Sequence, residues 1–453
     1  MNICFVSGNR EKLPDAVVPI GLLYIMANTP DTHRKELIDL CFAEDPQALL
    51  SATLSEKRPD VVAISMRNIQ NNDYSGLADN IDYYAALVQT VRKACSAKIV
   101  LGGAGFSVMP TELMDRIQPD FGISGEGEQA FPKLIAALEN DGLGLDRIGA
   151  LYRRDADQTI SNPRPPEFLD MDTLQTPDRS LVSRRYFAEW GCDSIQTKRG
   201  CPLRCDYCTY PIIEGRVGRT RNPEKVVDEM FESADRNPDI SHFFIVDSVF
   251  NLPRTHAKNV CKELIKRNWQ IPWTCYANPL GFDQEFADLA KAAGCAGMEI
   301  GSDSGVDRIL KNLHKGFTTE HIRKLHDICV KADVPDCHTF IIGTETESMD
   351  DVQKTINFMD ELDPYSAMIM IWIDDYEALD PAYRETRLAF RKDIEILLEE
   401  NRHLFPRWCV PSLKINFDER LFRALRRSGL HGPLWQHVNK LAPKHSALAT
   451  HQA

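Results

Sequence analysis

Three cysteines mark the stretch Lys198-Arg-Gly-Cys201-Pro-Leu-Arg-Cys205-Asp-Tyr-Cys208, where they follow one another at spacings of four and three residues. Residues 194–198 precede them and are predicted to form a β-strand, so the cysteines lie on the loop after that strand. Thiolates on one such loop can hold three corners of an iron–sulfur cube. Three ligands leave one iron open, and an open coordination position is what chemistry at the cluster requires.

The alternative is a zinc site, which would need a fourth Cys or His and usually contains a C-x2-C pair. The spacing favours the iron–sulfur cluster. We therefore expect a [4Fe–4S] centre whose metal ligands, and the core of whose catalytic machinery, are Cys201, Cys205 and Cys208.

Strands and helices alternate downstream of this loop. Between residues 191 and 373 the sequence predicts strands at 194–198, 242–246, 273–277, 297–300, 336–342 and 367–371, with helical periodicity between them. Repeated strand–helix units predict a parallel sheet, here a partial TIM-like βα barrel. Active sites of such barrels lie at the carboxyl ends of the strands, where the cysteine loop begins.

The rest of the chain divides into three parts. Residues 1–145 alternate strands with helices and predict a doubly wound, Rossmann-like α/β domain. Residues 146–190 predict a hairpin and a linker broken by proline and aspartate, and residues 374–453 predict a short, mostly helical C-terminal region.

Composition narrows the partners. The 453 residues carry a net charge of −13, which argues against a nucleic-acid surface. No apolar run is long enough to span a bilayer, and the N-terminus lacks the basic region of a signal peptide. We expect a cytoplasmic protein with no nucleic-acid and no membrane partner. Its 13 cysteines are an odd number, and we expect no disulfide framework.

The cysteine loop, with Tyr207 before the third cysteine and a barrel pattern behind it, resembles the radical S-adenosylmethionine (radical SAM) superfamily. The resemblance implies that the open iron chelates S-adenosylmethionine (SAM), and that an electron donor such as flavodoxin or ferredoxin drives its cleavage to a 5′-deoxyadenosyl radical. The positions that it assigns to SAM are Tyr207, Asp247, Glu299, Ser302, Ile342 and Gly343. Carboxylates at strand ends can also cap the next helix, and this alternative stays open for Asp247 and Glu299.

The order of α/β domain, hairpin linker and barrel resembles the radical SAM subgroup with a cobalamin-binding domain, over about residues 1–370. Ligands of doubly wound sheets bind beyond the carboxyl ends of the strands, where glycines permit close approach. The positions that the resemblance assigns to cobalamin are Pro19, Gly21, Ser65, Arg67, Asn68, Gly102, Gly103, Gly105, Gly125 and Glu126. The alternative is that these glycines only make tight turns.

One motif of many cobalamin domains is missing. The Asp-x-His-x-x-Gly sequence that supplies a histidine to cobalt is absent, and His33 is the only histidine in the first 145 residues. The resemblance therefore implies that cobalamin binds without a protein ligand on its lower face.

These features predict a cobalamin-dependent radical SAM methyltransferase. The resemblance implies that it acts on an unactivated carbon, or phosphorus, of a small metabolite or natural-product intermediate, through a 5′-deoxyadenosyl radical and methylcobalamin. Two alternatives remain: a radical cyclisation, rearrangement or hydrogen abstraction without methyl transfer, and a cobalamin or redox sensor that turns nothing over.

Overall fold

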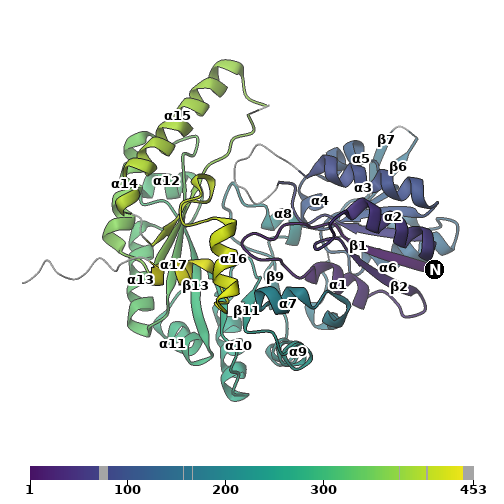
Figure 1. Cartoon of the computed structure of the whole chain (residues 1–453), viewed down its shortest axis with the longest axis horizontal. Coiled ribbons are helices and arrows are strands. Elements are labelled where there is room, and N and C mark those ends of the chain that lie inside the picture. Colours follow the sequence, from purple (N-terminus) through teal and green to yellow (C-terminus); the bar gives the residue numbers. More distant parts are fainter. Residues whose placement is uncertain (71–79, 157, 166, 377, 405–406, 442–453) are drawn as a thin grey trace, which may run out of the picture.

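The structure, a computed structural model, describes the chain except residues 71–79, 157, 166, 377, 405–406 and 442–453. Two α/β domains lie side by side, and the C-terminal segment packs on the second domain next to the first (Figure 1). None of the described helices is both long and apolar enough to cross a membrane.

The first domain contains a seven-stranded sheet in the order β2-β1-β3-β4-β5-β6-β7, in which β1 to β5 are parallel. The strands are β1 (Asn2–Ser7), β2 (Arg34–Asp39), β3 (Val61–Ser65), β4 (Lys98–Gly102), β5 (Phe121–Ile123), β6 (Leu151–Asp155) and β7 (Gln158–Ser161). This order confirms the expected doubly wound domain. Its direction reverses at β1, so the ligand crevice of such a sheet lies at the carboxyl ends of β1 and β3.

Helices cover both faces of this sheet. They are α1 (Ile20–Ala27), α2 (Pro46–Lys57), α3 (Ile81–Ala94), α4 (Ala104–Val108), α5 (Pro110–Ile117) and α6 (Ala130–Glu139). Apolar residues of α2, α3 and α5 pack on one face, and those of α1 and α6 pack on the other. Residues 8–19 form the loop from β1 to α1, and Asp15 in this loop pairs with Arg426 of the C-terminal segment.

The second domain contains seven parallel strands in the order β16-β15-β14-β13-β12-β11-β8. They are β8 (Cys192–Ile195), β11 (His242–Ile245), β12 (Trp273–Ala277), β13 (Cys295–Asp303), β14 (Asp336–Ile342), β15 (Ser366–Ile371) and β16 (Trp408–Cys409). The sheet is open, because β8 and β16 are its edges. The expected partial barrel is thus confirmed, with a seventh strand added from the C-terminal region.

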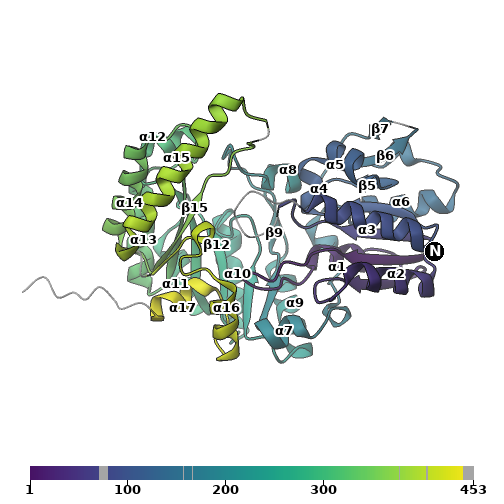
Figure 2. The ribbon, with the colours of Figure 1, turned by 45° about the horizontal axis from the view of Figure 1, so that its top comes forward.

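The outer face of the barrel sheet is covered by helices that alternate with its strands (Figure 2). They are α9 (Pro223–Arg236), α10 (Arg254–Lys266), α11 (Gln284–Ala292), α12 (Asp307–Asn312), α13 (Thr319–Ala332) and α14 (Met349–Leu362). The cysteine loop lies between the two strands of a small antiparallel ribbon, β9 (Lys198–Arg199) and β10 (Arg219–Thr220). The short helix α8 (Tyr210–Glu214) follows the cysteines before β10 begins. The sequence analysis continued the first barrel strand to residue 198, whereas β8 ends at Ile195.

The connecting and C-terminal segments complete the fold. The linker carries η1 (Leu145–Arg147), η2 (Met171–Thr173), η3 (Arg179–Leu181) and α7 (Arg185–Trp190), and the tail carries α15 (Pro381–Glu400), η4 (Arg402–Leu404), η5 (Pro411–Leu413), α16 (Glu419–Arg427) and α17 (Leu434–Leu441). Helix α17 contacts β15 and β16, so the tail closes one end of the barrel.

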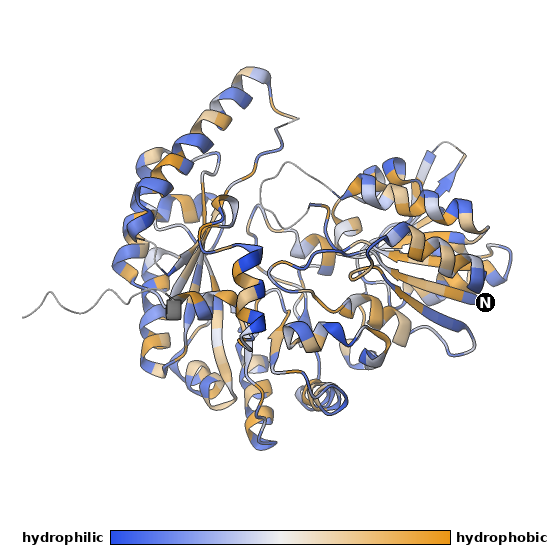
Figure 3. Ribbon diagram, viewed as in Figure 1, coloured by the Kyte–Doolittle hydropathy of each residue, from blue (hydrophilic) through white to orange (hydrophobic). Residues whose placement is uncertain are grey.

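The two domains share a hydrophobic core. One cluster of buried side chains joins Phe5 and Leu22 of the first domain with Phe187 of α7 and Val226 and Phe243 of the barrel. Figure 3 shows this hydrophobic character concentrated on the strands of both sheets. Because apolar burial crosses the boundary, the domains are expected to hold a fixed relative position.

A buried polar network reinforces the same boundary. Glu229 of α9 accepts hydrogen bonds from Tyr24 of α1 at 3.0 Å, from Arg179 at 2.8 Å and from Arg221 at 2.7 Å. All four side chains are buried. The carboxylate is therefore paired with two cations and joins α1 to the barrel through Tyr24.

Candidate active site

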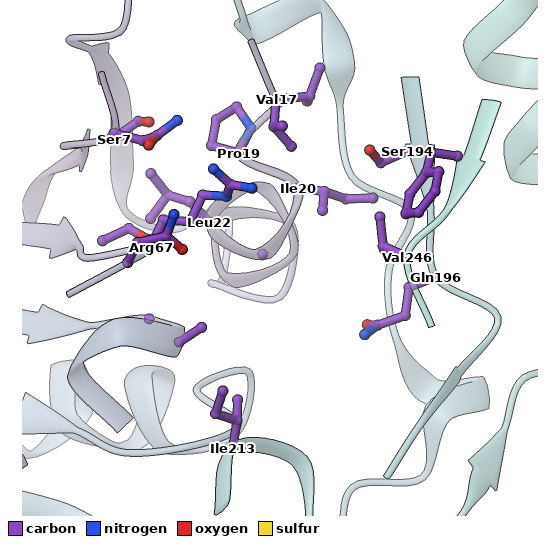
Figure 4. A pocket seen from close by; sticks show the side chains of 18 of the residues that line it. Ser7, Val17, Pro19, Ile20, Leu22, Arg67, Ser194, Gln196, Ile213 and Val246 are labelled. Carbon is purple, nitrogen blue, oxygen red and sulfur yellow. The ribbon is translucent and has the colours of Figure 1, made fainter. Parts of the chain in front are cut away.

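A cavity of about 720 Å³ lies between the two domains, which is within the usual size of small-molecule sites. One wall is the strand-end crevice of the first domain, with Ser7 and Arg67, and the other is the inner face of the barrel, with Ser194, Gln196 and Val246 (Figure 4). The cavity therefore joins the predicted cobalamin side to the inner face of the barrel, and Cys201, Cys205 and Cys208 are not among its lining residues.

Most positions that the sequence assigned to cobalamin line this cavity. They are Pro19, Gly21, Ser65, Arg67, Asn68, Gly102, Gly103, Gly125 and Glu126. Gly105 is not on the lining, because it packs against Met66 and Asn68 of its own domain. The residues thus come together from four successive strand ends, as ligand binding in a doubly wound sheet requires.

Two features of this wall fit a large polar ligand. A Cβ on Gly21 would meet nothing within 4 Å, so this residue leaves free space at the start of α1. The Nη1 atom of Arg67 is buried without a hydrogen-bond partner in the described part of the chain, and buried donors ordinarily have one. A corrin with its amide side chains would occupy the space and supply acceptors.

Gly103 has a different reason to be glycine. Its φ is +99°, and a Cβ would lie 2.5 Å from the Met66 carbonyl oxygen. This crowding comes from the chain itself, so the turn interpretation accounts for Gly103 whatever binds there. A Cβ on Gly102, by comparison, would come no closer than 3.6 Å to a neighbouring atom, the carbonyl oxygen of Ile123.

Glu126 connects the first domain to the cysteine loop. Its carboxylate accepts hydrogen bonds from Arg219 at 2.6 Å and from Arg199 at 3.2 Å, while Glu128 accepts one from Arg199 at 2.5 Å. Arg199 immediately precedes Gly200 and Cys201. The Gly-Glu-Gly-Glu segment therefore fixes the entry to the cysteine loop as well as lining the cavity.

Backbone hydrogen bonds hold the loop that carries the three cysteines. The Cys208 amide donates to the Cys205 carbonyl at 3.3 Å, and the Cys201 amide donates to the Gly215 carbonyl at 3.1 Å. Burial raises the pKa of both the Cys205 and the Cys208 thiol, and the neighbouring Cys201 raises it further. Thiols in this setting need a bound cation to become thiolates, and the donor set suits an iron–sulfur cluster.

A residue that the sequence analysis missed stands beside this loop. Asp303 ends β13 and accepts a hydrogen bond from Tyr207 at 2.6 Å, and its carboxylate pairs with Lys315 at 2.6 Å. Its φ of +61° turns the chain at the strand end. The sequence does mark the segment, because Asp303 belongs to the same Gly-Ser-Asp-Ser-Gly stretch as Ser302.

Ser302 lies on the other side of the strand. It is fully buried, and its Oγ lies 2.7 Å from His338 Nδ1. Asp336 in turn lies 2.9 Å from His338 Nε2 and 2.7 Å from His326 Nδ1. His326, Asp336 and His338 lie close enough together to ligate a metal ion. Each of them is already part of one hydrogen-bonded chain that joins β13, β14 and α13.

Asp247 braces the start of the cysteine loop. Its buried carboxylate accepts hydrogen bonds from the amides of Thr197 at 2.7 Å and Lys198 at 3.1 Å. Lys198 also donates from Nζ to the Gly200 carbonyl at 3.1 Å. Asp247 therefore holds the backbone between β8 and β9. The two roles expected from the sequence, a SAM contact and a helix cap, did not include this one.

The remaining expected positions are separated. Glu299 lines the cavity and accepts a hydrogen bond from Trp435 Nε1 at 3.0 Å. Ile342 is fully buried, and Gly343 has a φ of +86° with its carbonyl bonded to Arg387. Ile342 and Gly343 do not line the cavity.

Comparison with known proteins gives the class of this site. The model of the B12 binding domain matches residues 7–135, and the model of the radical SAM superfamily matches residues 195–359. The fold, the cysteine loop and these two matches define a radical SAM enzyme that carries a B12-binding domain. The chain belongs to the cobalamin-dependent radical SAM enzyme family, whose cofactors are a [4Fe–4S] cluster, SAM and cobalamin.

Individual relatives are distant. The chain is 27% identical over 421 residues to a tryptophan 2-C-methyltransferase of Streptomyces laurentii, covering 78% of this chain and 70% of the relative. It is 25% identical over 275 residues to an anaerobic magnesium-protoporphyrin IX monomethyl ester cyclase of Rubrivivax gelatinosus, covering 58% of this chain and 49% of the relative. The structure of the radical SAM methyltransferase TsrM of Kitasatospora setae has a TM-score of 0.83, with 22% identity and 97% of each chain covered. That likeness concerns the fold.

Proposed function

We propose that the protein is a methyltransferase that transfers a methyl group to an unactivated carbon, or phosphorus, of a small molecule. The observation that carries the proposal is the single cavity, which joins the strand-end crevice of the B12-binding domain to the inner face of the radical SAM barrel. When bound, the cluster and SAM would supply the hydrogen-abstracting radical, and cobalamin would carry the methyl group.

The side chains of this protein would hold and orient the reacting groups. Cys201, Cys205 and Cys208 would ligate the cluster. Tyr207 lies on that loop and bonds to Asp303, and it would bind SAM together with the other assigned positions except Glu299, namely Asp247, Ser302, Ile342 and Gly343. An electron donor such as flavodoxin or ferredoxin would reduce the cluster.

The shared core of the two domains supports a fixed distance between the cofactors. The tail supports exclusion of water, because Phe417 and Trp435 line the end of the cavity that α17 covers. Radical intermediates react with solvent and oxidants, so a closed chamber protects them.

The relatives supply two candidate reactions. The relative from Streptomyces laurentii is named as a methyltransferase and the one from Rubrivivax gelatinosus as a cyclase. The methyltransferase matches over more of both chains, and we therefore favour methyl transfer. Cyclisation without methyl transfer is the second candidate, and the number of methyl groups in the product distinguishes the two.

The first test is cofactor content and label transfer. The full chain, purified without oxygen and reconstituted with iron, sulfide and cobalamin, is expected to hold about four irons and about one corrin. A small-molecule extract is then incubated with it, SAM labelled in the methyl group, and a reductant. A product with a labelled methyl group supports the proposal. Cleavage of SAM with an unlabelled product would contradict it in favour of the cyclase.

A cysteine pair provides the control. Cys205→Ala is expected to lose the iron and the SAM cleavage while it keeps the corrin, because Cys205 lies in the barrel and the crevice in the other domain. Cys95→Ala, in the first domain, is expected to keep all three. Undiminished SAM cleavage in Cys205→Ala would overturn the assignment of the cluster.

A further inference from the structure

The barrel side of the cavity differs from the cobalamin side. Its wall is mainly apolar and aromatic, and it runs along the inner faces of the strands to the tail. The residues that form it are Phe244, Val246, Tyr276, Met368, Phe417 and Leu434. Side chains of this kind bind the flat apolar surface of a ligand through area burial and ring contacts.

A carboxylate on a barrel strand, that of Glu299, interrupts this apolar wall, to which Glu214 of α8 and His242 of β11 also contribute polar groups. Glu299 of β13 accepts a hydrogen bond from Trp435 Nε1 at 3.0 Å, and in the described part of the chain it has no other hydrogen bond and no ion pair. The other acidic lining residues of the cavity do have charged or amide partners, as in the pair of Asp15 with Arg426 at 2.6 Å. Burial raises the pKa of Glu299 to about 7.

The surroundings of Glu299 are built around Trp435. A Cβ on Gly297 would lie 2.4 Å from Cη2 of Trp435, so the glycine makes room for the indole beneath the carboxylate. The ring of Tyr365 packs edge-on against Trp435, with centroids 6.0 Å apart. Trp435 therefore has one position, and it fixes one oxygen of Glu299 while the side chain faces the cavity.

Glu299 is far from the cluster loop along its strand. Asp303, which contacts Tyr207, lies four residues further on, and four residues of β-strand span roughly 13 Å. The sequence analysis assigned Glu299 to SAM. This distance and its place in the cavity favour another ligand.

We propose that Glu299, held by Trp435, recognises the substrate, and that the substrate is a flat, largely apolar small molecule that presents an N–H or O–H donor to this carboxyl group. The proposal rests on the proposed function, since it assumes that the reacting molecule lies in the cavity. Glu299 and Trp435 are positioning residues here: the carboxyl group orients the substrate, and the indole orients the carboxyl group.

The test measures binding without turnover, with two matched pairs of probes. Indole and benzothiophene have nearly the same shape, and only indole has an N–H; 2-naphthol and naphthalene differ by one O–H. Affinities are measured by equilibrium dialysis with the reconstituted full chain in the presence of SAM. A hydrogen bond to a carboxylate is worth enough to favour each donor-bearing probe by roughly tenfold.

Two substitutions locate the effect. Glu299→Met keeps the volume and is expected to reduce the preference of each pair to about one. Glu299→Gln keeps a carbonyl acceptor and is expected to retain part of the preference, which protects the test if the methionine variant folds poorly. SAM binding is expected to be unchanged in both variants.

Several outcomes overturn the proposal. These are no binding of any probe to the wild-type chain, equal binding within both pairs, or a preference that survives in a folded Glu299→Met variant. Weaker SAM binding with unchanged probe preference would return Glu299 to the SAM site. Because none of these measurements needs a methylated product, failure of the methyltransferase assay leaves the result interpretable.

Discussion

A buried ion pair holds Tyr207, the aromatic residue of the cysteine loop. Asp303 and Lys315 are each almost fully buried, and Tyr207 bonds to both. Removing one partner of a buried pair leaves the other charge in a medium that solvates it poorly. The pair therefore fixes the aromatic ring that precedes Cys208.

We expect Lys315→Met to destabilise the chain by about 3–5 kcal/mol, because Asp303 would lose its cation. The measurement is thermal unfolding of the apoprotein. Lys266→Met is the control, since Lys266 pairs with Glu263 on an exposed surface of α10 and exposed pairs contribute little. Equal losses in the two variants would contradict the expectation.

Glu299 predicts a pH dependence. Its pKa is raised by burial from 4.5 to about 7, so the folded chain binds the proton more tightly than the unfolded chain does. Its contribution to stability is fully present below about pH 4.5 and is lost as the pH rises through about 7. The titratable groups near it are the thiols of Cys275 and Cys337 on the neighbouring strands, and burial raises the pKa of both so that they stay neutral in this range.

Because glutamine does not ionise, Glu299→Gln is expected to lose less stability than the wild-type chain between pH 5 and pH 8. Melting temperatures of the apoprotein at several pH values in that range check this. Glu320→Gln, at an exposed position of α13, should follow the wild-type curve. Parallel curves for wild type and Glu299→Gln would be evidence against a raised pKa.

Sequence reasoning reaches furthest where chemistry fixes the spacing of the residues. Three cysteines on one loop need no knowledge of the sheet, and the strand-end glycines mark the crevice of any doubly wound domain. Asp303 needed the register of β13, which runs to Asp303 with an irregular pairing near its end. The sequence predicted this strand only as residues 297–300, so the side chains beyond it could not be assigned to a face.

Among the elements, the ribbon of β9 and β10 connects the barrel to the first domain through side-chain hydrogen bonds. Arg199 of β9 and Arg219 of β10 both bond to the Gly-Glu-Gly-Glu segment of the first domain. The same segment lines the cobalamin side of the cavity. A ligand that moves this segment would also move Arg199, and with it the start of the cysteine loop.

Arg199→Gln is expected to loosen residues 196–220, because Glu128 would lose its buried cation. A loss of about 3 kcal/mol in local stability accelerates amide exchange by roughly a hundredfold. Hydrogen exchange read by mass spectrometry measures it. Arg184→Gln, whose pair with Asp239 is exposed, should leave the loop unchanged. Unaltered exchange in Arg199→Gln would show that the loop is held by its own backbone.

Elements with weak patterns escaped prediction. β2 is polar, since it is an edge strand with little of its length buried, and β9, β10 and β16 have two residues each. Periodicity cannot reveal a two-residue strand. Long apolar strands and amphipathic helices were predictable because burial on one face imposes their pattern.

For the whole molecule, the shared core predicts cooperative unfolding. The hydrophobic cluster and the Glu229 network both cross the domain boundary, so neither domain can unfold without exposing part of the other. We expect one thermal transition by calorimetry. A ligand at 100 times its dissociation constant adds about 2.7 kcal/mol to stability, so cobalamin should move the entire transition upward. Two separate peaks, with only one moved by cobalamin, would refute this.

The tail has a consequence for how such a protein diversifies. Trp435 lines the end of the cavity that α17 covers, yet it lies outside both matched domains and beyond every residue assigned to a cofactor. Changes in the last few dozen residues can thus reshape the chamber without disturbing the machinery that generates radicals. The tail can therefore change which molecule is modified, whether through natural selection or through grafting of tails between homologues.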